Sequence, residues 1–367
     1  MRIFFCLFVL IVCSLFSPVQ ADELSPRDEA IRKATRWLLT QQGEDGRWRS
    51  ETYGVMRSGV GNTGLILEAL REPTSSESRG IQGEVDEAIR RGFHSLLITP
   101  PSERVDSPIY GAAFLLMISD RISTFPKAGR KVLIDRLLKA QQVPANGWPE
   151  NAVGRGGWGV EPDPATAESN PANLSVTVTV LKALSQTNSI TPEVREEALS
   201  FLNRCRNSQF RPDGGFWFLP RPDDHLNKAG WFQNEKGELQ PYSYATATCD
   251  GIVALRKLGF AEESGDVQAA LKALLMQDRP SIPVQPVEPD EIVSPLAGLY
   301  FYHAAALSGV WKETQDLRLS DRCNAVCQEL VSLQKEDGSW ENPIAWMRED
   351  DPFIATALAL IALKRFE

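Results

Sequence analysis

The stretch SLQKEDGSWEN, residues 332–342, repeats a phrase that stands near the start of the chain as TQQGEDGRWRS, residues 40–50. Each copy places a Gln at the end of an amphipathic segment, followed by Asp-Gly and then by a Trp two residues after the Gly. Gly permits the positive φ of a tight turn, Asp bonds its own backbone, and Trp supplies a large apolar face. The phrase therefore predicts a helix end, a turn and an apolar anchor.

Two weaker copies lie between these. They are QQVPANGWPEN, residues 141–151, with Gln142 and Trp148, and SQFRPDGGFWF, residues 208–218, with Trp217. Self-similarity at a fixed period is typical of a repeat architecture. The copies, with two eroded positions, predict helix ends at a mean interval close to sixty residues, near residues 42, 98, 142, 209, 277 and 334.

Each interval also holds a second, more uniformly apolar segment with helical character. These segments are residues 61–72, 107–122, 170–185, 242–259, 294–310 and 351–366. The first segments, such as residues 25–42 and 191–209, instead alternate charged and apolar residues. A helix that is apolar all round must be buried, so we expect the second helices to form an inner ring and the amphipathic ones an outer ring. The prediction is an all-α protein, an α/α toroid of six helical hairpins over residues 22–367.

Composition excludes some classes of partner. The 367 residues carry a formal charge of −9, and Lys and Arg form no stripe or block, which argues against a nucleic-acid partner. Residues 1–21 hold one Arg, an apolar run over residues 3–16 and a Val-Gln-Ala end, the layout of a secretory signal peptide. We therefore expect an exported, periplasmic or secreted protein, without a stable membrane span once this segment is removed. The sequence leaves open whether the segment is cleaved or kept as an anchor.

Export makes the four cysteines of the mature chain informative, because an oxidising compartment permits disulfides. Cys323 and Cys327 stand four residues apart in a helical pattern, where their side chains run parallel and suit a bridge poorly. We expect Cys205, Cys249, Cys323 and Cys327 to be small buried residues, and the sequence leaves their disulfide state open.

The repeated Gln-x-x-Asp-Gly-x-Trp phrase resembles the repeat of the squalene cyclases. The plan of six helix pairs is similar to the α/α toroid that those enzymes share with the protein prenyltransferases. Residues 156–184, GGWGVEPDPATAESNPANLSVTVTVLKAL, also resemble segments of bacterial squalene-cyclase-like proteins. The resemblance covers essentially the whole mature chain, but the shared residues are scaffold, so function must be sought at the mouth, where the inner helices begin.

One hypothesis is terpene cyclisation. The resemblance implies an Asp-x-Asp-Asp-Thr-Ala motif whose middle Asp protonates an alkene, and residues 348–357, REDDPFIATA, match it most nearly. Asp350 would be the acid and Asp351 its neighbour. However, Arg348 replaces the first Asp, and the Thr-Ala pair lies four residues too late. Asp350 and Asp351 also suit a plain helix cap, with Pro at the first helical position.

A second hypothesis is a zinc site of the prenyltransferase kind. The Tyr-His pair at Tyr302 and His303 resembles that family's inner helix, which would make His303 a ligand. Cys249 and Asp250 are adjacent where the family's ligands lie two apart, and adjacent helical residues point about 100° from each other. A catalytic zinc needs three ligands at good geometry, so we expect no metal and no cofactor.

A third hypothesis is ligand binding without these chemistries. Aromatic residues gather in the later loops and at the starts of inner helices, where they could line a mouth that takes an isoprenoid, a lipid or a polysaccharide. The candidate ligand-binding residues are Trp158, Trp217, Trp231, Tyr244, Tyr302, His303 and Trp346.

We therefore predict an exported toroid that binds an apolar or polymeric ligand at an aromatic-lined mouth. One alternative is a terpene cyclase-like enzyme that uses Asp350 as its acid. Another is an exported carbohydrate-active α/α-barrel enzyme, because paired carboxylates can serve glycoside hydrolysis. The sequence leaves open whether the protein is an enzyme. For the carbohydrate-active alternative, the candidate carboxylates lie in the long loops and are Glu161, Asp163, Asp223 and Asp224.

Overall fold

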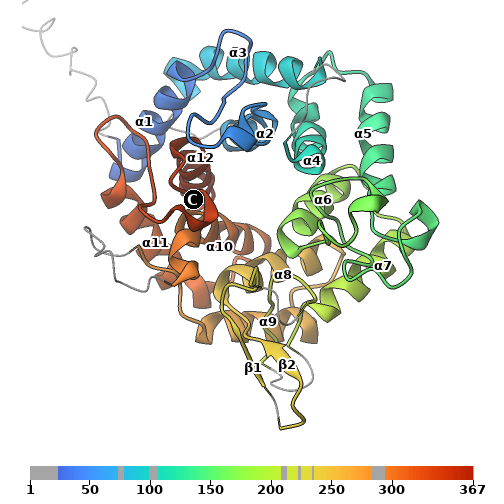
Figure 1. The fold of residues 1–367 in the computed structure, drawn as a ribbon. Helices are drawn as coiled ribbons and strands as arrows, with labels where there is room; N and C mark the ends of the chain where they lie inside the picture. Colours follow the sequence, from blue (N-terminus) through green and yellow to red (C-terminus); the bar gives the residue numbers. More distant parts are fainter. Residues whose placement is uncertain are drawn as a thin grey trace, which may run out of the picture.

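The computed structural model describes residues 24–72, 78–98, 106–207, 213–221, 225–233, 235–282 and 294–366. In these ranges the chain forms twelve α-helices and one two-stranded antiparallel sheet. Figure 1 shows the helices as two concentric rings around a common axis. The expected all-α toroid of six hairpins is confirmed, while the segment expected to be a signal peptide, residues 1–21, lies outside the described residues.

The rings alternate along the chain. The outer helices are α1 (Pro26–Thr40), α3 (Ser78–Leu97), α5 (Lys127–Lys139), α7 (Pro192–Arg204), α9 (Gly265–Met276) and α11 (Ser320–Leu333). The inner helices are α2 (Val60–Arg71), α4 (Pro108–Ile118), α6 (Leu174–Gln186), α8 (Ala245–Lys257), α10 (Tyr300–Thr314) and α12 (Pro352–Arg365). The strands are β1 (Trp231–Gln233) and β2 (Leu239–Pro241). Short 3₁₀ turns are Gly54–Met56, Ser119–Arg121, Pro144–Asn146, Pro164–Thr166, Pro295–Leu299, Leu317–Leu319 and Ala345–Met347.

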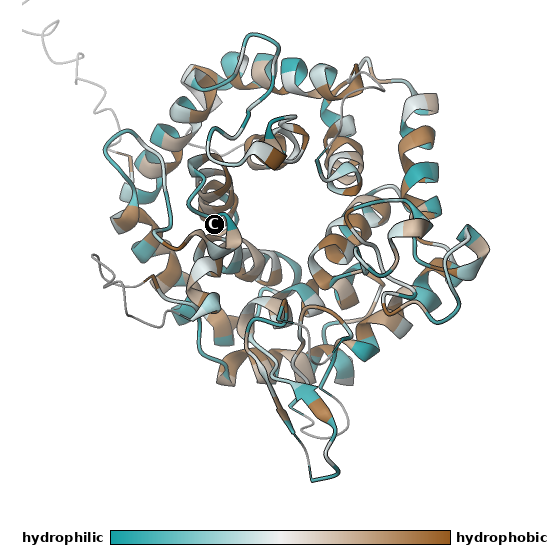
Figure 2. Ribbon diagram, in the orientation of Figure 1, coloured by the Kyte–Doolittle hydropathy of each residue, from teal (hydrophilic) through white to brown (hydrophobic). Residues whose placement is uncertain are grey.

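Burial follows the predicted division between the rings. Figure 2 shows apolar residues around the inner helices, and in α4 every residue except Tyr110 is buried. The outer helix α1 buries only one face, and α7 does likewise. Both begin where the sequence predicted, because Ser25 caps α1 through the Asp28 N–H and Thr191 caps α7 through the Val194 N–H.

The repeated phrase joins each unit to the next outer helix. Gln42, at the end of α1, donates its amide to the carbonyl of Gly46 and to that of Ala88 in α3, each at 2.9 Å. Gln334, at the end of α11, donates in the same way to Gly338 and to Ala30 in α1, each at 2.9 Å. The second copy therefore closes the ring that the first copy opens.

In the first and last copies the Trp forms hydrogen bonds with both the outer helix and its inner partner. The Trp48 indole donates to the Leu38 carbonyl of α1 at 2.8 Å, and its backbone N–H donates to the Thr63 hydroxyl of α2 at 3.0 Å. Trp340 repeats both bonds on α11 and α12, at 2.8 and 3.0 Å. Trp48 and Trp340 are both fully buried, which agrees with the predicted anchor role.

The third copy lies elsewhere than the sequence predicted. Gln141, not Gln142, donates to Gly156 and to Val194 in α7, and the Trp158 indole donates to the carbonyl at the end of α5. Trp148 is therefore not the anchor of this unit. The inserted residues between Gln141 and Gly156 form a surface loop, which the chain tolerates at small cost but which hides the spacing.

The fourth copy is shifted by one residue. Its turn glycine is Gly214, as predicted, but the backbone N–H that meets the inner-helix Thr248 hydroxyl belongs to Phe216, at 3.1 Å. Phe216 is fully buried and so takes the place expected for Trp217.

The turn glycines of the four copies cannot be replaced without strain. Gly338 has φ +96°, and a Cβ there would lie 2.7 Å from the Lys33 carbonyl oxygen of α1. Gly46, Gly156 and Gly214 have similar φ and meet a carbonyl of α3, α7 and α9 just as closely. The phrase therefore needs Gly both for its turn and for the approach of two backbones.

Two further expectations can be compared with the described residues. Cys205, Cys249 and Cys323 are buried and Cys327 is half-buried, all four as free thiols. Among the described helices, none is both long and apolar enough to span a bilayer.

Candidate functional site

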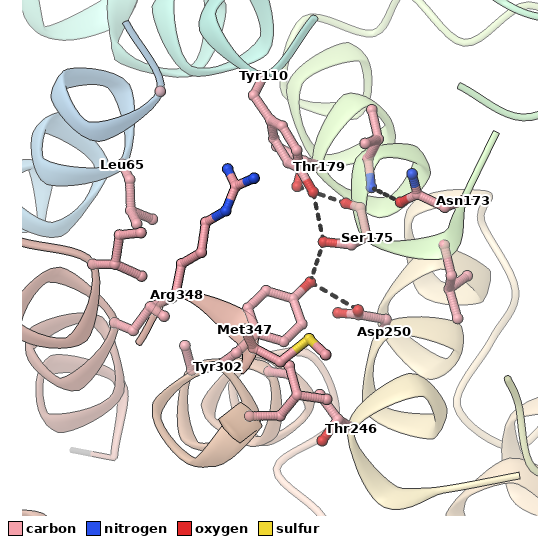
Figure 3. Close-up of a pocket in the computed structure, with 18 of the residues that line it drawn as sticks. Leu65, Tyr110, Asn173, Ser175, Thr179, Thr246, Asp250, Tyr302, Met347 and Arg348 are labelled. Atoms are coloured by element: carbon pink, nitrogen blue, oxygen red, sulfur yellow. Dashed lines mark hydrogen bonds between the residues drawn. The ribbon is translucent and has the colours of Figure 1, made fainter. Parts of the chain in front are cut away.

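A cavity of about 400 Å³ lies inside the inner ring, and Figure 3 shows part of its wall. Each inner helix contributes residues one turn apart, such as Ser175, Thr179 and Lys182 of α6. On α12 the lining runs from Ile354 to Arg365, which at 1.5 Å per residue corresponds to a depth of roughly 16 Å. The inner helices begin at the mouth, so the cavity extends from the loops at their N-termini toward their C-termini.

Four polar side chains from four inner helices form a continuous chain of hydrogen bonds across the wall (Figure 3). Tyr110 and Ser175 lie 2.7 Å apart, Ser175 and Tyr302 lie 2.6 Å apart, and the Tyr302 hydroxyl donates to Asp250 at 2.8 Å. Because Tyr302 gives its only hydroxyl proton to Asp250, Ser175 must donate to Tyr302 and Tyr110 to Ser175. Each hydroxyl in this series of hydrogen bonds therefore donates in the direction of Asp250.

Asp250 is the carboxyl group at the end of this series of hydrogen bonds. It is only 4% exposed, and burial raises its pKa to about 6, although Lys182 and the Tyr302 bond oppose the shift. Burial also raises the pKa of Tyr302 and of Tyr110, which keeps both phenols protonated. A weakly acidic medium therefore leaves much of Asp250 as the neutral acid, able to give a proton to a bound molecule.

The other two acidic residues of the lining have structural partners. Glu68 is buried and accepts from Arg365 at 2.8 Å, and this ion pair lies in the lining near the C-terminal ends of α2 and α12. Glu349 accepts from the backbone N–H groups of Phe301 and Tyr302, at 2.9 and 2.7 Å, and so caps the start of α10. Burial nevertheless raises the pKa of Glu349 to about 7.

The sequence-predicted binding residues are divided by the structure. Tyr244 and Tyr302 line the cavity. His303 is buried behind the wall, with Nδ1 3.3 Å from the Thr246 hydroxyl, and burial lowers its pKa to about 3. Trp158 and Trp217 are buried outside the lining, whereas Trp231 on β1 and Trp346 are 44% and 64% exposed, also outside it.

The two predicted catalytic residues lie at the rim. Asp350 accepts from the Tyr53 hydroxyl at 2.5 Å, and Asp351 is the N-cap of α12, accepting from the Phe353 N–H at 2.9 Å. Neither lines the cavity. The cap interpretation of Asp351 is confirmed, and a catalytic role of either residue stays a prediction.

Sequence reasoning missed Asp250 as an acid, because it considered this residue only as a zinc ligand. The available signal was a carboxylate in the middle of a helix that is otherwise apolar, since such groups are rarely buried without a role. Tyr110 and Ser175 gave no such signal. In the described part of the chain, no three His, Cys, Asp or Glu residues are grouped as a metal site requires.

Comparisons with known proteins bear on the fold. No family model and no curated protein matches the chain. Among solved structures it resembles the type II terpene cyclase MstE from Scytonema in complex with merosterolic acid A, its product, at 15% identity and a TM-score of 0.57, over 93% of this chain and 96% of that one. The two proteins share the α/α toroid fold.

The same toroid occurs in a second kind of enzyme. The GH76A α-1,6-mannanase from Salegentibacter sp. HEL1_6 is 13% identical to this chain, with a TM-score of 0.58, over 93% of this chain and 98% of that one. At such identities the likeness concerns architecture, so function must come from the site itself.

Proposed function

We propose that the protein binds an elongated apolar ligand of the isoprenoid type in its central cavity and that Asp250 protonates it there. The observation that carries this proposal is Asp250 itself, a buried acid with a pKa of about 6, oriented by Tyr302 on the wall of the cavity. The proposal includes export, with residues 1–21 removed from the mature chain.

The remaining lining suits such a ligand. Between the mouth and the Glu68–Arg365 pair the wall is mainly apolar, with Leu65, Phe114 and Leu358 on three different helices. Tyr110 and Phe114 are stacked with ring centroids 6.1 Å apart, and aromatic faces stabilise a positive charge that develops near them. MstE has been crystallised with geranylgeranyl dihydroxybenzoate as its substrate, a molecule with such a chain.

The proposed chemistry is balanced without a cofactor. Asp250 transfers its proton to one carbon of an alkene, which leaves a carboxylate and creates a carbocation on the neighbouring carbon. A second double bond of the same chain closes a ring onto that cation, and loss of a proton from the product cation restores an alkene. The Tyr110–Ser175–Tyr302 chain offers a path by which a proton returns to Asp250.

The test is deuterium incorporation from heavy water into geranylgeranyl dihydroxybenzoate, with the mature chain and its Asp250→Asn variant. We expect cyclised, deuterated product from the wild type and a loss of at least about a hundredfold in Asp250→Asn, because an amide cannot supply the proton. Wild-type turnover should fall as pH rises through about 6, since the acid form of Asp250 is then lost.

Asp350→Asn is the matched control. Asp350 touches Tyr53 at the rim, so its substitution should leave turnover within a fewfold of the wild type. Loss of turnover in Asp350→Asn with activity kept in Asp250→Asn would return the catalytic role to Asp350.

A second candidate, glycan binding at the rim, has one observation in its favour. Trp346 is 64% exposed in the loop that precedes α12, and exposed aromatic faces can stack on sugars. Glu161 and Asp163 do not line the cavity, and Asp223 and Asp224 lie outside the described residues. Release of sugars from an α-1,6-mannan by the wild type would favour this candidate over the first.

A further inference from the structure

Arg348 occupies a conformation that its residue type disfavours. It follows the 3₁₀ turn Ala345–Met347 with φ +65°, in the left-handed region where Gly or Asn is at ease. Two backbone bonds hold it there, from the Arg348 N–H to Ala345 and from the Asp351 N–H to Arg348, at 3.1 and 3.2 Å. Strained backbone conformations of this kind cluster at functional sites, so the contacts of the Arg348 side chain are of interest.

The side chain reaches into the cavity. Figure 3 shows the guanidinium in the middle of the opening, between Leu65 and Tyr110, and Arg348 belongs to the lining. The guanidinium lies over the face of Tyr53, with its carbon 5.5 Å from the ring centroid. Among the described residues, no carboxylate, carbonyl or hydroxyl bonds to this guanidinium.

The neighbouring acids are engaged elsewhere. Glu349 caps the start of α10, and Asp350 accepts from Tyr53. Deeper in the cavity, Glu68 is paired with Arg365. The lining thus offers Arg348 no carboxylate partner. With Arg348 included it has one more basic residue than acidic residues: the basic ones are Lys182, Lys228, Arg348 and Arg365, and the acidic ones are Glu68, Asp250 and Glu349.

We propose that Arg348 binds an acidic head group of the cavity ligand, so that the ligand is an amphiphile inserted with its apolar tail first. A guanidinium offers paired donors that fit a carboxylate or a phosphate. At the open mouth such a head keeps part of its hydration while the tail lies along the apolar wall. The inference rests on the proposed cavity ligand and adds its chemical class.

Binding the head at the mouth would also set the register of the tail. Asp250 lies in the second turn of α8 on the wall, so a fixed head determines which atoms of the ligand tail lie beside the acid. Arg348 is thus proposed as a positioning residue for the reaction, acting on the part of the ligand that does not react.

The test compares three probes with one tail, namely geranylgeranoic acid, geranylgeranyl monophosphate and geranylgeraniol, by calorimetric titration of the mature chain. We expect the wild type to bind at least one acidic probe about tenfold or more tightly than the alcohol, since a bond between charged groups supports such a difference. Arg348→Asn, which tolerates the left-handed backbone, should bring the acidic probe to within about twofold of the alcohol.

Two controls accompany this variant. Arg348→Lys keeps the charge and should retain part of the preference, whereas Arg57→Asn removes an exposed arginine outside the lining and should retain all of it. Whichever acidic probe binds more tightly identifies the head group as carboxylate or phosphate.

The outcomes separate the two proposals. If the wild type binds the alcohol as tightly as both acids, or if Arg348→Asn weakens all three probes equally, the head-group inference is wrong while the cavity proposal stands. If the wild type binds none of the three probes, both are wrong.

Discussion

At the scale of single residues, the proposed role of Arg348 comes with a cost in stability, because its backbone has a positive φ. A left-handed backbone costs a side chain with a Cβ roughly 1–2 kcal/mol relative to glycine. We therefore predict that Arg348→Gly raises the free energy of unfolding by about 1 kcal/mol, measured by urea denaturation. Arg57→Gly, a substitution with no such strain to relieve, serves as the comparison. A destabilised Arg348→Gly would show that the contact of Arg348 with Tyr53 outweighs the strain.

Glu349 is a second residue whose effect can be measured separately. Its pKa rises from 4.5 to about 7 on folding, because burial penalises the charged form more than its three hydrogen bonds favour it. The folded state therefore holds the proton more tightly than the unfolded state. The resulting stability is fully present below pH 4.5 and is lost as pH rises through about 7, to a total of about 3 kcal/mol.

The prediction is that Glu349→Gln flattens this part of the curve of unfolding free energy against pH. The amide keeps an acceptor for the Phe301 and Tyr302 N–H groups but does not titrate. Glu341→Gln, at an exposed carboxylate, should leave the slope between pH 4.5 and 7 unchanged. An unchanged slope in Glu349→Gln would assign the pH dependence to other groups.

At the scale of elements, the close approach at the turn glycines can be separated from their backbone angle. Gly338 and Gly259 share a positive φ, at +96° and +86°. A Cβ on Gly338 would meet the Lys33 carbonyl at 2.7 Å, whereas one on Gly259 would meet nothing within 4 Å. Gly338→Ala should therefore destabilise the fold by at least about 1 kcal/mol more than Gly259→Ala, in parallel urea denaturations. Equal losses would mean that the α11 turn can move away from α1 without cost.

The sequence predicted the anchor of a turn phrase correctly only where the Gln, the Gly and the anchor lie close together along the chain. In the phrases with Trp48 and Trp340 these residues span seven positions, so both anchors were predicted correctly. The third was placed at Trp148 instead of Trp158, because an insertion separated the Gln from its Gly while the helices around it kept their geometry. The fourth was placed one residue late, at Trp217, because Trp was favoured over the Phe216 that carries the anchor bond.

At the scale of the molecule, the fold could be predicted and the site could not. The two rings follow from amphipathic and apolar helices, which are patterns within single segments. Asp250, Tyr302, Ser175 and Tyr110 meet only because four helices converge on one axis. Only Tyr302 was identified beforehand as a binding residue, since its position at the start of an inner helix is visible in the sequence.

The closure of the ring has a consequence for how the chain can be connected. Helix α12 packs against α1 and α2, and the Arg27 side chain donates to the Phe366 carbonyl at 3.3 Å, so the first and last helices of the described chain lie side by side. A linker could join them, and new ends could be opened at the short connection between α6 and α7, on the side away from the mouth. Such a circular permutant would contain the same cavity. In the natural order of synthesis, by contrast, the bond from Gln334 to Ala30 cannot form until nearly the whole chain has been made.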